Sequence, residues 1–309
     1  MSIILHHYPL SPFSEKIRAM LGYTNQEWSS CLTSEAPPRG KLDLLSGGYN
    51  RIPVAQVGAD IFCDTSLIAD ELAAIADEPS LANEALNQGL LTERQWLESK
   101  LFFACVNKAF SLSLLRRIAK DKGLWNLLLF LKDRIEMGAK ASVSLGSPRS
   151  ANKHIKQGLS YLSENLSSNE FIGGNTPNIL DFSAYHCFWF LTEVGLKKDI
   201  SKNTAALAWY QKMKAFTNSP DNEISIDTAI DIGREAQPRQ LDKRYTSDHR
   251  IGSKVVIAPS DYRQVPVTGT LVGVDSQRWI ISRNNPETGL IHLHFPSNAV
   301  DVNIRLPKQ

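Results

Sequence analysis

Short β-type runs and helical segments alternate over the first 75 residues. The β-type runs are Ile3–Tyr8, Trp28–Leu32, Val54–Val57 and Ile61–Cys63, and the last two are separated by Gly58-Ala59-Asp60, a hairpin signal. Apolar residues recur at helical spacing in Ser14–Leu21 and in Thr65–Ala74, and Gly22 follows the first segment where a helix C-cap glycine would lie. The prolines and glycines between residues 37 and 48 mark a long loop with one helical turn near Leu42–Leu45.

The pattern changes after the polar linker Asp77–Ser80. Five long helix-periodic segments follow, with aromatic residues such as Trp96, Phe102 and Phe110 at helical spacing: 84–111, 114–145, 151–166, 178–196 and 204–216. This pattern predicts an all-α bundle that extends to about residue 235.

A third pattern of apolar and polar residues begins after the polar stretch 237–250. Four short β-type runs are separated by turn residues, and several of them offer one apolar face at period two: Lys254–Ile257 (Val255 and Ile257), Val267–Val274 (Val272 and Val274), Arg278–Ser282 (Trp279 and Ile281) and Leu290–Phe295 (Ile291, Leu293 and Phe295). They predict a small all-β, SH3-like barrel that folds on its own and supplies no catalytic group. The chain thus divides into a thioredoxin-like α/β domain (1–77), an all-α domain (84–235) and a β-barrel domain (250–309).

Composition and charge exclude several classes of protein. With 42% hydrophobic and 21% charged residues the chain is globular and not disordered. The net charge of +2 gives no strong signal, and the ten Lys/Arg against six Asp/Glu of residues 239–309 suggest an anionic partner only weakly, so no nucleic acid is expected. No apolar run approaches the ~20 residues of a membrane span, and no signal peptide is expected.

The four cysteines lie far apart, without a CxxC motif or a Cys/His cluster. This favours reduced thiols in a cytoplasmic protein and gives no metal site. His292 and His294 share one strand face, but no third ligand accompanies them, so a packing or surface role is favoured over a metal.

The first chemical signal is Tyr8-Pro9-Leu10-Ser11-Pro12-Phe13, which places a hydroxyl between the first strand and the first helix. The start of a helix offers free N–H groups and a positive dipole end, which favour a thiolate. A hydroxyl there can donate a hydrogen bond to sulfur. The alternative is that Ser11 only caps the helix. Tyr8 is a second candidate for such a hydroxyl.

Two further signals flank the predicted hairpin. In a thioredoxin-like fold, Pro53 of Arg51-Ile52-Pro53-Val54 would be cis and would expose the main chain of Ile52 to a ligand, although an ordinary turn proline is the commoner case. Asp64-Thr65 starts a helix after the hairpin, where free N–H groups and a hydroxyl bind a carboxylate and Asp64 meets an ammonium. The alternative is a helix cap and nothing more.

The spacing of Ser11, Ile52-Pro53 and Asp64-Thr65 resembles the glutathione transferase family. Ser11-Pro12-Phe13 resembles the Ser-Pro-Phe of tau-class members, and omega-class relatives have a cysteine at that serine. Asp64-Thr65 replaces the usual Glu-Ser or Gln-Ser. The stretch from Phe171 to Asp181 is similar to the family's capping box in the helical domain. The resemblance covers about residues 1–220 and leaves the tail out.

The resemblance implies a glutathione S-transferase, cytoplasmic, homodimeric and serving detoxification, without a cofactor other than glutathione as co-substrate. Ser11 would stabilise the thiolate, which attacks a small hydrophobic electrophile. Ile52 and Pro53 would hold the cysteinyl backbone, Asp64 and Thr65 the γ-glutamyl group, Arg39 or Lys41 the glycyl carboxylate, and Phe13 with aromatics of 96–103 the electrophile.

Two other interpretations of the sequence stay open. One is a non-catalytic binding or scaffold protein with the same fold. The other is a glutathione-dependent thiol reductase, which Ser11 disfavours because that chemistry needs a cysteine to form the mixed disulfide.

Overall fold

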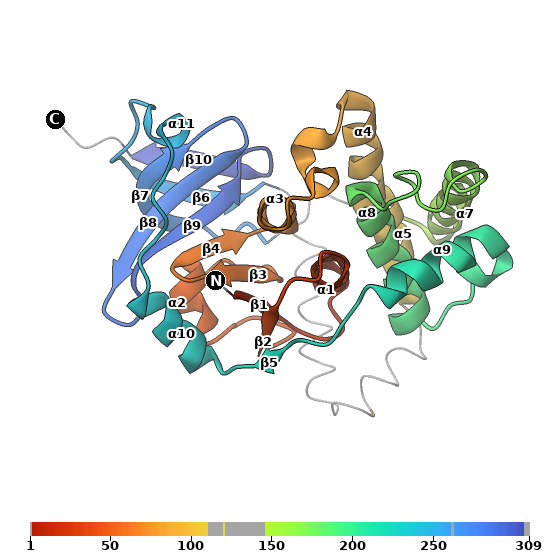
Figure 1. The fold of residues 1–309 in the computed structure, drawn as a ribbon, viewed down its shortest axis with the longest axis horizontal. Helices are drawn as coiled ribbons and strands as arrows, with labels where there is room; N and C mark the ends of the chain where they lie inside the picture. The colour runs from red at the N-terminus through yellow and green to blue at the C-terminus, as the bar shows by residue number, and fades with distance from the viewer. Residues whose placement is uncertain (1, 111–119, 121–145, 261–262, 306–309) are drawn as a thin grey trace.

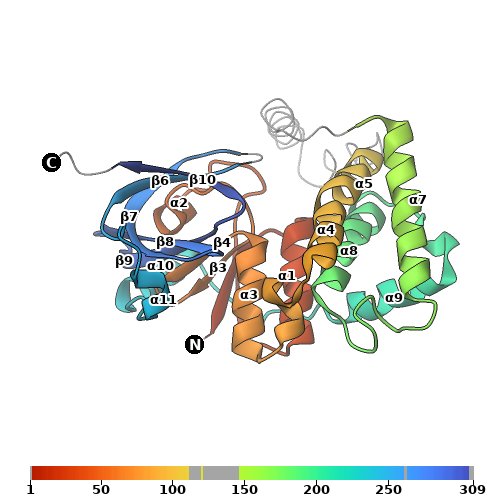
Figure 2. The ribbon, with the colours of Figure 1, turned by 90° about the horizontal axis from the view of Figure 1, so that it is seen from above.

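The computed structural model describes residues 2–110, 120, 146–260 and 263–305. Figure 1 shows three parts: an α/β region near the N-terminus, a helical region on one side of it and a β-rich region of the C-terminal residues on the other. Figure 2 shows the helical and the C-terminal regions at opposite ends of the molecule. The segment 114–145, predicted to be helical, lies outside the described residues, apart from residue 120.

The N-terminal region has the predicted thioredoxin-like element order. Its strands are β1 (Ile3–His7), β2 (Trp28–Leu32), β3 (Val54–Val57) and β4 (Asp60–Cys63), and its helices are α1 (Pro12–Tyr23), α2 (Leu42–Ser46) and α3 (Thr65–Ala76). β1 is parallel to β2 and antiparallel to β3, which is antiparallel to β4. The carboxyl ends of β1 and β4 and the start of β3 therefore lie at one end of the sheet, and the loops that follow or precede them meet there.

The helical region begins after two short 3-10 turns, η1 (Pro79–Leu81) and η2 (Asn83–Ala85). Its elements are α4 (Gln88–Trp96), a π-helical turn η3 (Leu97–Leu101), α5 (Phe102–Ala109), α7 (Pro148–Asn165), α8 (Ile179–Trp189), a second π-helical turn η4 (Phe190–Val194), the 3-10 turn η5 (Ile200–Lys202) and α9 (Thr204–Ala215). The predicted capping box is confirmed: the Asn178 side chain accepts from the backbone at the start of α8, and Asp181 accepts from the Asn178 N–H.

The chain then returns to the N-terminal region. The short strand β5 (Asn222–Glu223) pairs with β2, and α10 (Ile226–Glu235) packs its buried Ala229 and Ile230 with Leu45 of α2. The helical periodicity predicts that α10 belongs to the helical bundle, whereas its buried face belongs to the core on the other side of the sheet. Amphipathic periodicity shows that a helix has a buried face, and it does not show which neighbour covers that face.

The C-terminal region contains α11 (Lys243–Thr246) and five strands: β6 (Lys254–Pro259), β7 (Val267–Val274), β8 (Arg278–Asn285), β9 (Gly289–Pro296) and β10 (Val300–Arg305). These strands do not form a separate sheet, because β9 pairs in parallel with β4, from Asp60↔His292 to Phe62↔His294. The described strands make one ten-stranded sheet in the order β10-β6-β7-β8-β9-β4-β3-β1-β2-β5. The all-β character is as predicted, and the SH3-like barrel is not confirmed.

One predicted strand face differs from the structure. Leu271 is fully buried and Val272 only partly so, although the alternation predicts that Val272 and Val274 share the buried face. The register between β7 and β8 shifts between Leu271 and Gly273. Such a bulge adds one residue to a strand and reverses the side on which the following residues lie.

Two apolar cores lie on opposite faces of the sheet. The first joins α1, α3 and the helical region. The second joins residues of the N-terminal region, among them Leu45, Tyr49, Ile52 and Ile61, with residues of the C-terminal strands: Val255, Ile257, Val267, Leu271, Val274, Ile281, Ile291, Leu293 and Phe295. The C-terminal strands thus share both a sheet and a core with the N-terminal region.

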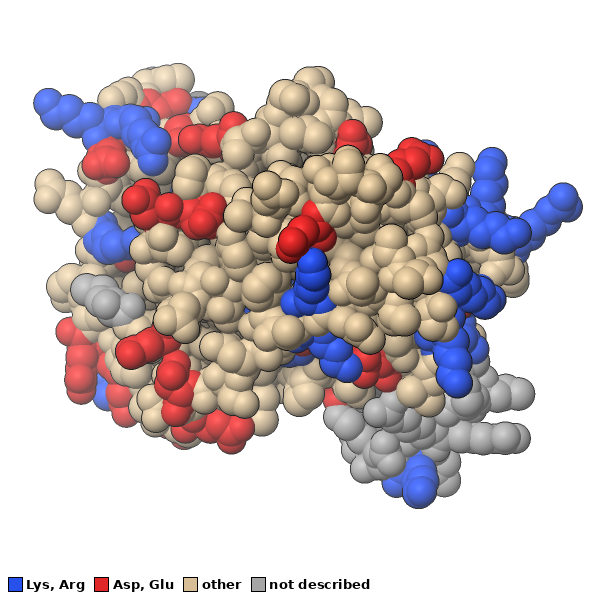
Figure 3. Space-filling model, turned by 45° about the vertical axis from the view of Figure 1, so that its right-hand side comes forward, with Lys and Arg blue, Asp and Glu red and all other residues tan. Residues whose placement is uncertain are grey.

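Surface charge is unevenly distributed. On the face in Figure 3, Lys and Arg side chains gather toward the helical end, while Asp and Glu are more frequent over the opposite part. The exposed lysines of the helical region include Lys153 and Lys156 of α7 and Lys212 and Lys214 of α9. Among the described residues, no helix has both the length and the hydropathy that a membrane crossing requires.

Candidate functional site

The candidate residues come from three loops at one end of the N-terminal sheet. Ser11 follows β1, Ile52 and Pro53 precede β3, and Asp64 and Thr65 follow β4. Because His6 pairs with Val54 and Val54 with Cys63, the three strands bring these loops to the same end of the sheet. The sequence-predicted residues are therefore grouped as the fold requires.

Ser11 is the N-cap of α1. Its Oγ accepts a hydrogen bond from the Ser14 N–H at 3.2 Å, so the cap role is filled. The hydroxyl hydrogen has no acceptor among the described residues and is free to donate. The residue is only 1% exposed, so a thiol reaches this hydroxyl only when neighbouring side chains move. Tyr8 is more exposed, and its ring packs on the second core beneath the Arg39 guanidinium, 6.0 Å from the ring centre.

Ile52 and Pro53 are joined by a cis peptide bond, as predicted. Ile52 lies outside strand β3, and among the described residues neither its N–H nor its C=O takes part in a hydrogen bond. The residue is 8% exposed. Main-chain groups of a largely buried residue normally pair with protein, water or ligand, so their lack of partners among the described residues is uncommon.

Asp64 and Thr65 occupy the start of α3. Asp64 has φ 91°, caps the helix by accepting from the Ser66 N–H at 2.9 Å, and lies 4.0 Å from the Arg51 guanidinium. Burial raises the pKa of Asp64, and the charge of Arg51 opposes this. Thr65 is partly exposed and its hydroxyl makes no hydrogen bond among the described residues, so the start of α3 offers a free hydroxyl and helix N–H groups.

The two residues expected at the glycyl carboxylate have other contacts. Arg39 is buried and donates to the carbonyl oxygens of Ser34 and Asn50. The Lys41 Nζ lies 2.5 Å from Asp227 of α10. Arg39 therefore holds Asn50 of the loop that precedes β3, whereas Lys41 joins the start of α2 to α10 at the exposed surface.

Phe13 faces the helical region. The centre of its ring lies 4.7 Å from the ring centre of Phe102 and 5.2 Å from that of His186. Burial lowers the pKa of His186 to about 4, so this imidazole is neutral near pH 7. Phe103 and Val106 are partly exposed beside this cluster. The site thus has an apolar, aromatic wall next to the start of α1.

The structure also shows charged residues that the periodicity did not single out. Lys16 of α1 is fully buried and donates to Glu98 of η3 and to the Ser183 hydroxyl of α8. Glu15 accepts from the hydroxyls of Tyr185 and Thr217. The only sequence signal was the run of charges Glu15, Lys16 and Arg18 immediately after Ser11.

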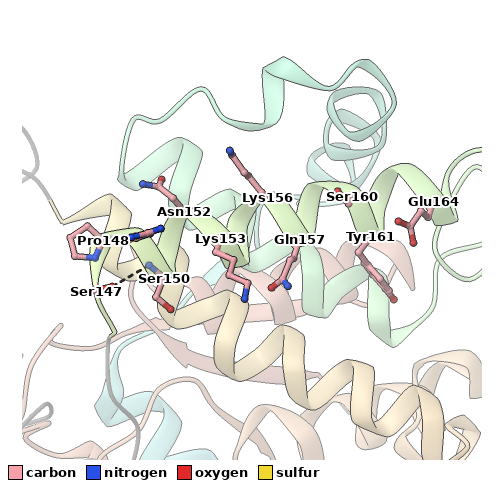
Figure 4. Close-up of a pocket in the computed structure, with 11 residues that line it drawn as sticks. Ser147, Pro148, Ser150, Asn152, Lys153, Lys156, Gln157, Ser160, Tyr161 and Glu164 are labelled. Carbon is pink, nitrogen blue, oxygen red and sulfur yellow. Dashed lines mark hydrogen bonds between the residues drawn. The ribbon is translucent and has the colours of Figure 1, made fainter.

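Two other hollows lie away from these residues. One, of about 450 Å³, separates α3 from the C-terminal region, and many of its charges pair with each other: Asp60 accepts from His294 Nε2 at 2.8 Å, and Arg239 contacts Asp60 and Glu71. The other runs along α7. Figure 4 shows that its lining residues lie along that helix, with Lys153, Lys156 and Glu164 among them. Neither hollow contains a sequence-predicted site residue.

The four cysteines are free and buried. Burial raises the pKa of the Cys31 thiol to about 11 and raises that of Cys63, Cys105 and Cys187. None of them is therefore a ready thiolate nucleophile. Within the described ranges, no group of three or more His, Cys, Asp and Glu residues has the arrangement of a metal site.

Comparison with known proteins points to one family. Residues 5–80 match the sequence family described as "Glutathione S-transferase, N-terminal domain". A GST-like protein from Pseudomonas syringae is 28% identical to the chain, with a TM-score of 0.80, over 99% of this chain and 100% of that one. The chain has a glutathione S-transferase-like fold.

A second structure supports the fold alone. The glutathione transferase GSTFuA3 from Phanerochaete chrysosporium has a TM-score of 0.56 at 18% identity, over 72% of this chain and 99% of that one. The match to the Pseudomonas syringae protein extends over the C-terminal strands as well, so that protein shares the whole arrangement. No curated protein sequence matches the chain.

Proposed function

We propose that the chain is a glutathione S-transferase that binds reduced glutathione between the starts of α1, β3 and α3 and transfers its sulfur to a small apolar electrophile. The observation that carries the proposal is the main chain of Ile52, which has no hydrogen-bond partner among the described residues and lies between Ser11 and Asp64-Thr65. A peptide-like ligand supplies the missing partners, because glutathione has its own main-chain N–H and C=O groups.

Each of these residues binds a different part of glutathione. Ile52 pairs with the cysteinyl part, with Pro53 fixing the approach of the chain. Asp64 accepts from the γ-glutamyl ammonium, while Thr65 and the N–H groups at the start of α3 bind its carboxylate. The Ser11 hydroxyl donates its free hydrogen to the sulfur, and the positive end of α1 further favours the thiolate. The thiolate then attacks an electrophile held beside Phe13 and Phe102.

Direct binding tests this proposal. Titration calorimetry with reduced glutathione, together with retention on immobilised glutathione, is expected to show a complex. Turnover of a model aryl halide tests the chemistry. Ser11→Ala should lower kcat much more than it raises Kd, because the hydroxyl acts on the thiolate and little on ground-state binding. Tyr8→Phe is the control, and full turnover in Ser11→Ala with loss in Tyr8→Phe would move the role to Tyr8.

One observation favours a second function, that of a non-catalytic binding protein. Ser11 is almost completely buried and already caps α1. A chain that binds glutathione but turns over no electrophile, or that binds none at millimolar concentration, would favour this alternative. The thiol-reductase alternative is disfavoured by the raised thiol pKa of all four cysteines.

The proposal includes a cytoplasmic homodimer acting in detoxification. The pairing of β9 with β4 covers an edge of the N-terminal sheet, so the proposed dimer has to use other surfaces. Light scattering over a range of concentrations tests this, and a constant monomer mass would contradict it.

A further inference from the structure

The loop that carries Ile52 has two sides. Residues 47–53, called here the ligand loop, run from the end of α2 to the start of β3. On one side lie Arg51 and Asp64, 4.0 Å apart, and the main chain of Ile52. The other side is covered by residues of the C-terminal strands.

Apolar contacts make up most of this cover. Tyr49 is 2% exposed, and its ring meets that of Phe295 of β9 edge-on, with 5.9 Å between the ring centres. Tyr49 and Ile52 belong to the same core as Phe295 and Val267. Tyr49 therefore packs on the C-terminal region three positions before Ile52, whose side chain lies in the core that the two regions share.

The closest approach is at Gly47. Its φ is +68°, and a Cβ placed there would lie 2.6 Å from Cγ1 of Val267 and 3.2 Å from Nε of Arg283. Gly48 also has a positive φ, +92°, but a Cβ there would meet nothing within 4 Å. The loop thus fits against β7 at one glycine and is open at the next.

A polar contact completes the cover. The Arg263 guanidinium, from the segment that precedes β7, donates to the carbonyl oxygen of Asn50 at 3.0 Å. The same oxygen accepts from Arg39 of the N-terminal region at 3.3 Å. The loop is thus held jointly by the N-terminal region and by residues more than 200 positions later in the chain.

We infer that the C-terminal region positions the ligand loop for glutathione, with Val267, Phe295 and Arg263 as positioning residues that do not touch the ligand. This inference rests on the proposed function for its ligand, while the contacts that hold the loop stand independently of it. A displaced loop moves the main chain of Ile52 away from the starts of α1 and α3. Glutathione binding should then weaken even where the fold persists.

The matched pair Gly47→Ala and Gly48→Ala tests this in the full chain. Both variants place a methyl group at a positive φ, and Gly48, at +92°, lies farther from the left-handed helical region than Gly47, at +68°, so backbone strain alone would act at least as strongly at Gly48. Only Gly47→Ala collides with Val267. It should raise the Kd of reduced glutathione about tenfold, while Gly48→Ala changes it less than about twofold. Adding Val267→Ala removes Cγ1 and should restore most of the affinity of Gly47→Ala, which general destabilisation would not do.

Hydrogen exchange of peptides that span residues 47–57, without ligand, gives a readout of the loop that does not need glutathione. Exchange should rise in Gly47→Ala and fall back in the double variant. If the wild type binds no glutathione but this exchange pattern holds, the proposed function fails and the positioning of the loop stands. Equal effects of the two glycine variants on exchange and on Kd would overturn the inference.

Arg263→Gln supplies a second test in case Gly47→Ala does not fold. It removes the bond to Asn50 and should raise the Kd about threefold and increase exchange in the same peptides. Arg250→Gln is its control, because Arg250 pairs with Asp248 and stacks on Trp279 within the C-terminal region. If Arg263→Gln changes neither the hydrogen exchange of the loop peptides nor the Kd, or if Arg250→Gln changes them as much, the result would count against the inference.

Discussion

The N-terminal region meets its two neighbours by different means. Toward the helical region, α1 presents buried charged side chains, each with a specific partner. Lys16 bonds to Glu98 and Ser183, and Glu15 bonds to Tyr185 at 2.7 Å and to Thr217 at 2.8 Å. These bonds are directional, and each depends on one side chain at one position.

Toward the C-terminal region, contact is made by the main chain and by apolar packing. β4 and β9 share ladder hydrogen bonds, and Ile61, Leu293 and Phe295 are fully buried in the common core. Asp60 is the main polar contact here, held by His294 and Arg239. Burial alone would raise the pKa of Asp60, but the hydrogen bond from His294 and the charge of Arg239 outweigh it and lower the pKa.

The difference teaches which changes each interface tolerates. A main-chain ladder and an apolar core accept conservative substitutions but not the loss of the whole partner. A network of buried charges persists as a unit but is sensitive to the loss of one member, because the remaining charge is left buried without its partner. Whole-region deletion should therefore reveal one interface, and single substitutions the other.

Deletion of residues 240–309 should have the largest effect. It exposes the edge of β4 and the buried side chains of Tyr49 and Ile61, and it removes the His294 partner of Asp60. We expect an insoluble product, or one without a cooperative thermal transition. Co-expression of 240–309 as a separate chain should restore solubility. A soluble truncated protein with a cooperative transition would show that the C-terminal region is a separable module, as the sequence alone suggests.

Acidification should have the next largest effect and should act on both interfaces. Burial lowers the pKa of His6, His186 and His294 from 6.5 to about 4. The unfolded chain takes up these protons below pH 6.5 and the folded chain does not, so stability is full above pH 6.5 and falls until about pH 4. At pH 5.5 these three imidazoles together account for a loss of about 4 kcal/mol.

Urea unfolding at a series of pH values measures this loss. The free energy of unfolding should change less steeply with pH in His294→Gln, on the C-terminal side, and in His186→Gln, on the helical side. A free energy of unfolding that stays constant between pH 7 and pH 5 would show that these imidazoles take up protons without unfolding.

Lys16→Met should lower the free energy of unfolding by about 3 kcal/mol, the low end for a broken buried ion pair. Glu98 and Ser183 lose this ammonium, while Arg94 still pairs with Glu98 at 3.1 Å. Lys108→Met is the control. Lys108 pairs with Asp199 at 2.7 Å but is partly exposed and joins elements within the helical region. Its loss should cost less than about 1 kcal/mol. Urea unfolding measures both, and equal losses would contradict the special role of the charge on α1.

Local features of this molecule were accessible from the sequence. The start of α1 at Ser11-Pro12, the start of α3 at Asp64 and the capping box of Asn178 and Asp181 depend on residues within four positions of each other. The three loops of the candidate site were also placed together correctly, because the strand order of a thioredoxin-like domain dictates it. Their glutathione roles remain predictions.

Long-range features were not accessible. The partners that Glu15 and Lys16 find outside α1 lie 82 to 202 positions away, so an ordinary charged helix face and a buried network have the same local sequence. The pairing of β4 with β9 joins residues more than 230 positions apart. Alternating apolar residues predict a strand with a buried face but do not name its neighbour. A separate barrel was the simpler prediction. It is incomplete because the C-terminal strands share a core with the N-terminal region.

The smallest predicted effect compares two tyrosine hydroxyls. Tyr185 donates to Glu15 across the interface with α1 at 2.7 Å and is fully buried, whereas Tyr210 donates to Glu193 within the helical region at 2.9 Å, where Glu193 is partly exposed. Tyr185→Phe should cost about 1.5 kcal/mol and Tyr210→Phe about 0.5 kcal/mol, because the carboxylate left behind is buried only in the first case.

Urea unfolding of the two variants, with the wild type as reference, distinguishes these values. Both substitutions remove one hydroxyl and keep the ring, so packing changes little and the difference reports the carboxylate's surroundings. Thr217 and Arg18 still donate to Glu15 in Tyr185→Phe, which keeps the loss well below that of Lys16→Met. If Tyr210→Phe costs as much as Tyr185→Phe, the bonds that α1 makes across the interface are no more sensitive than those inside the helical region, and the contrast between the two interfaces would rest on Lys16 alone.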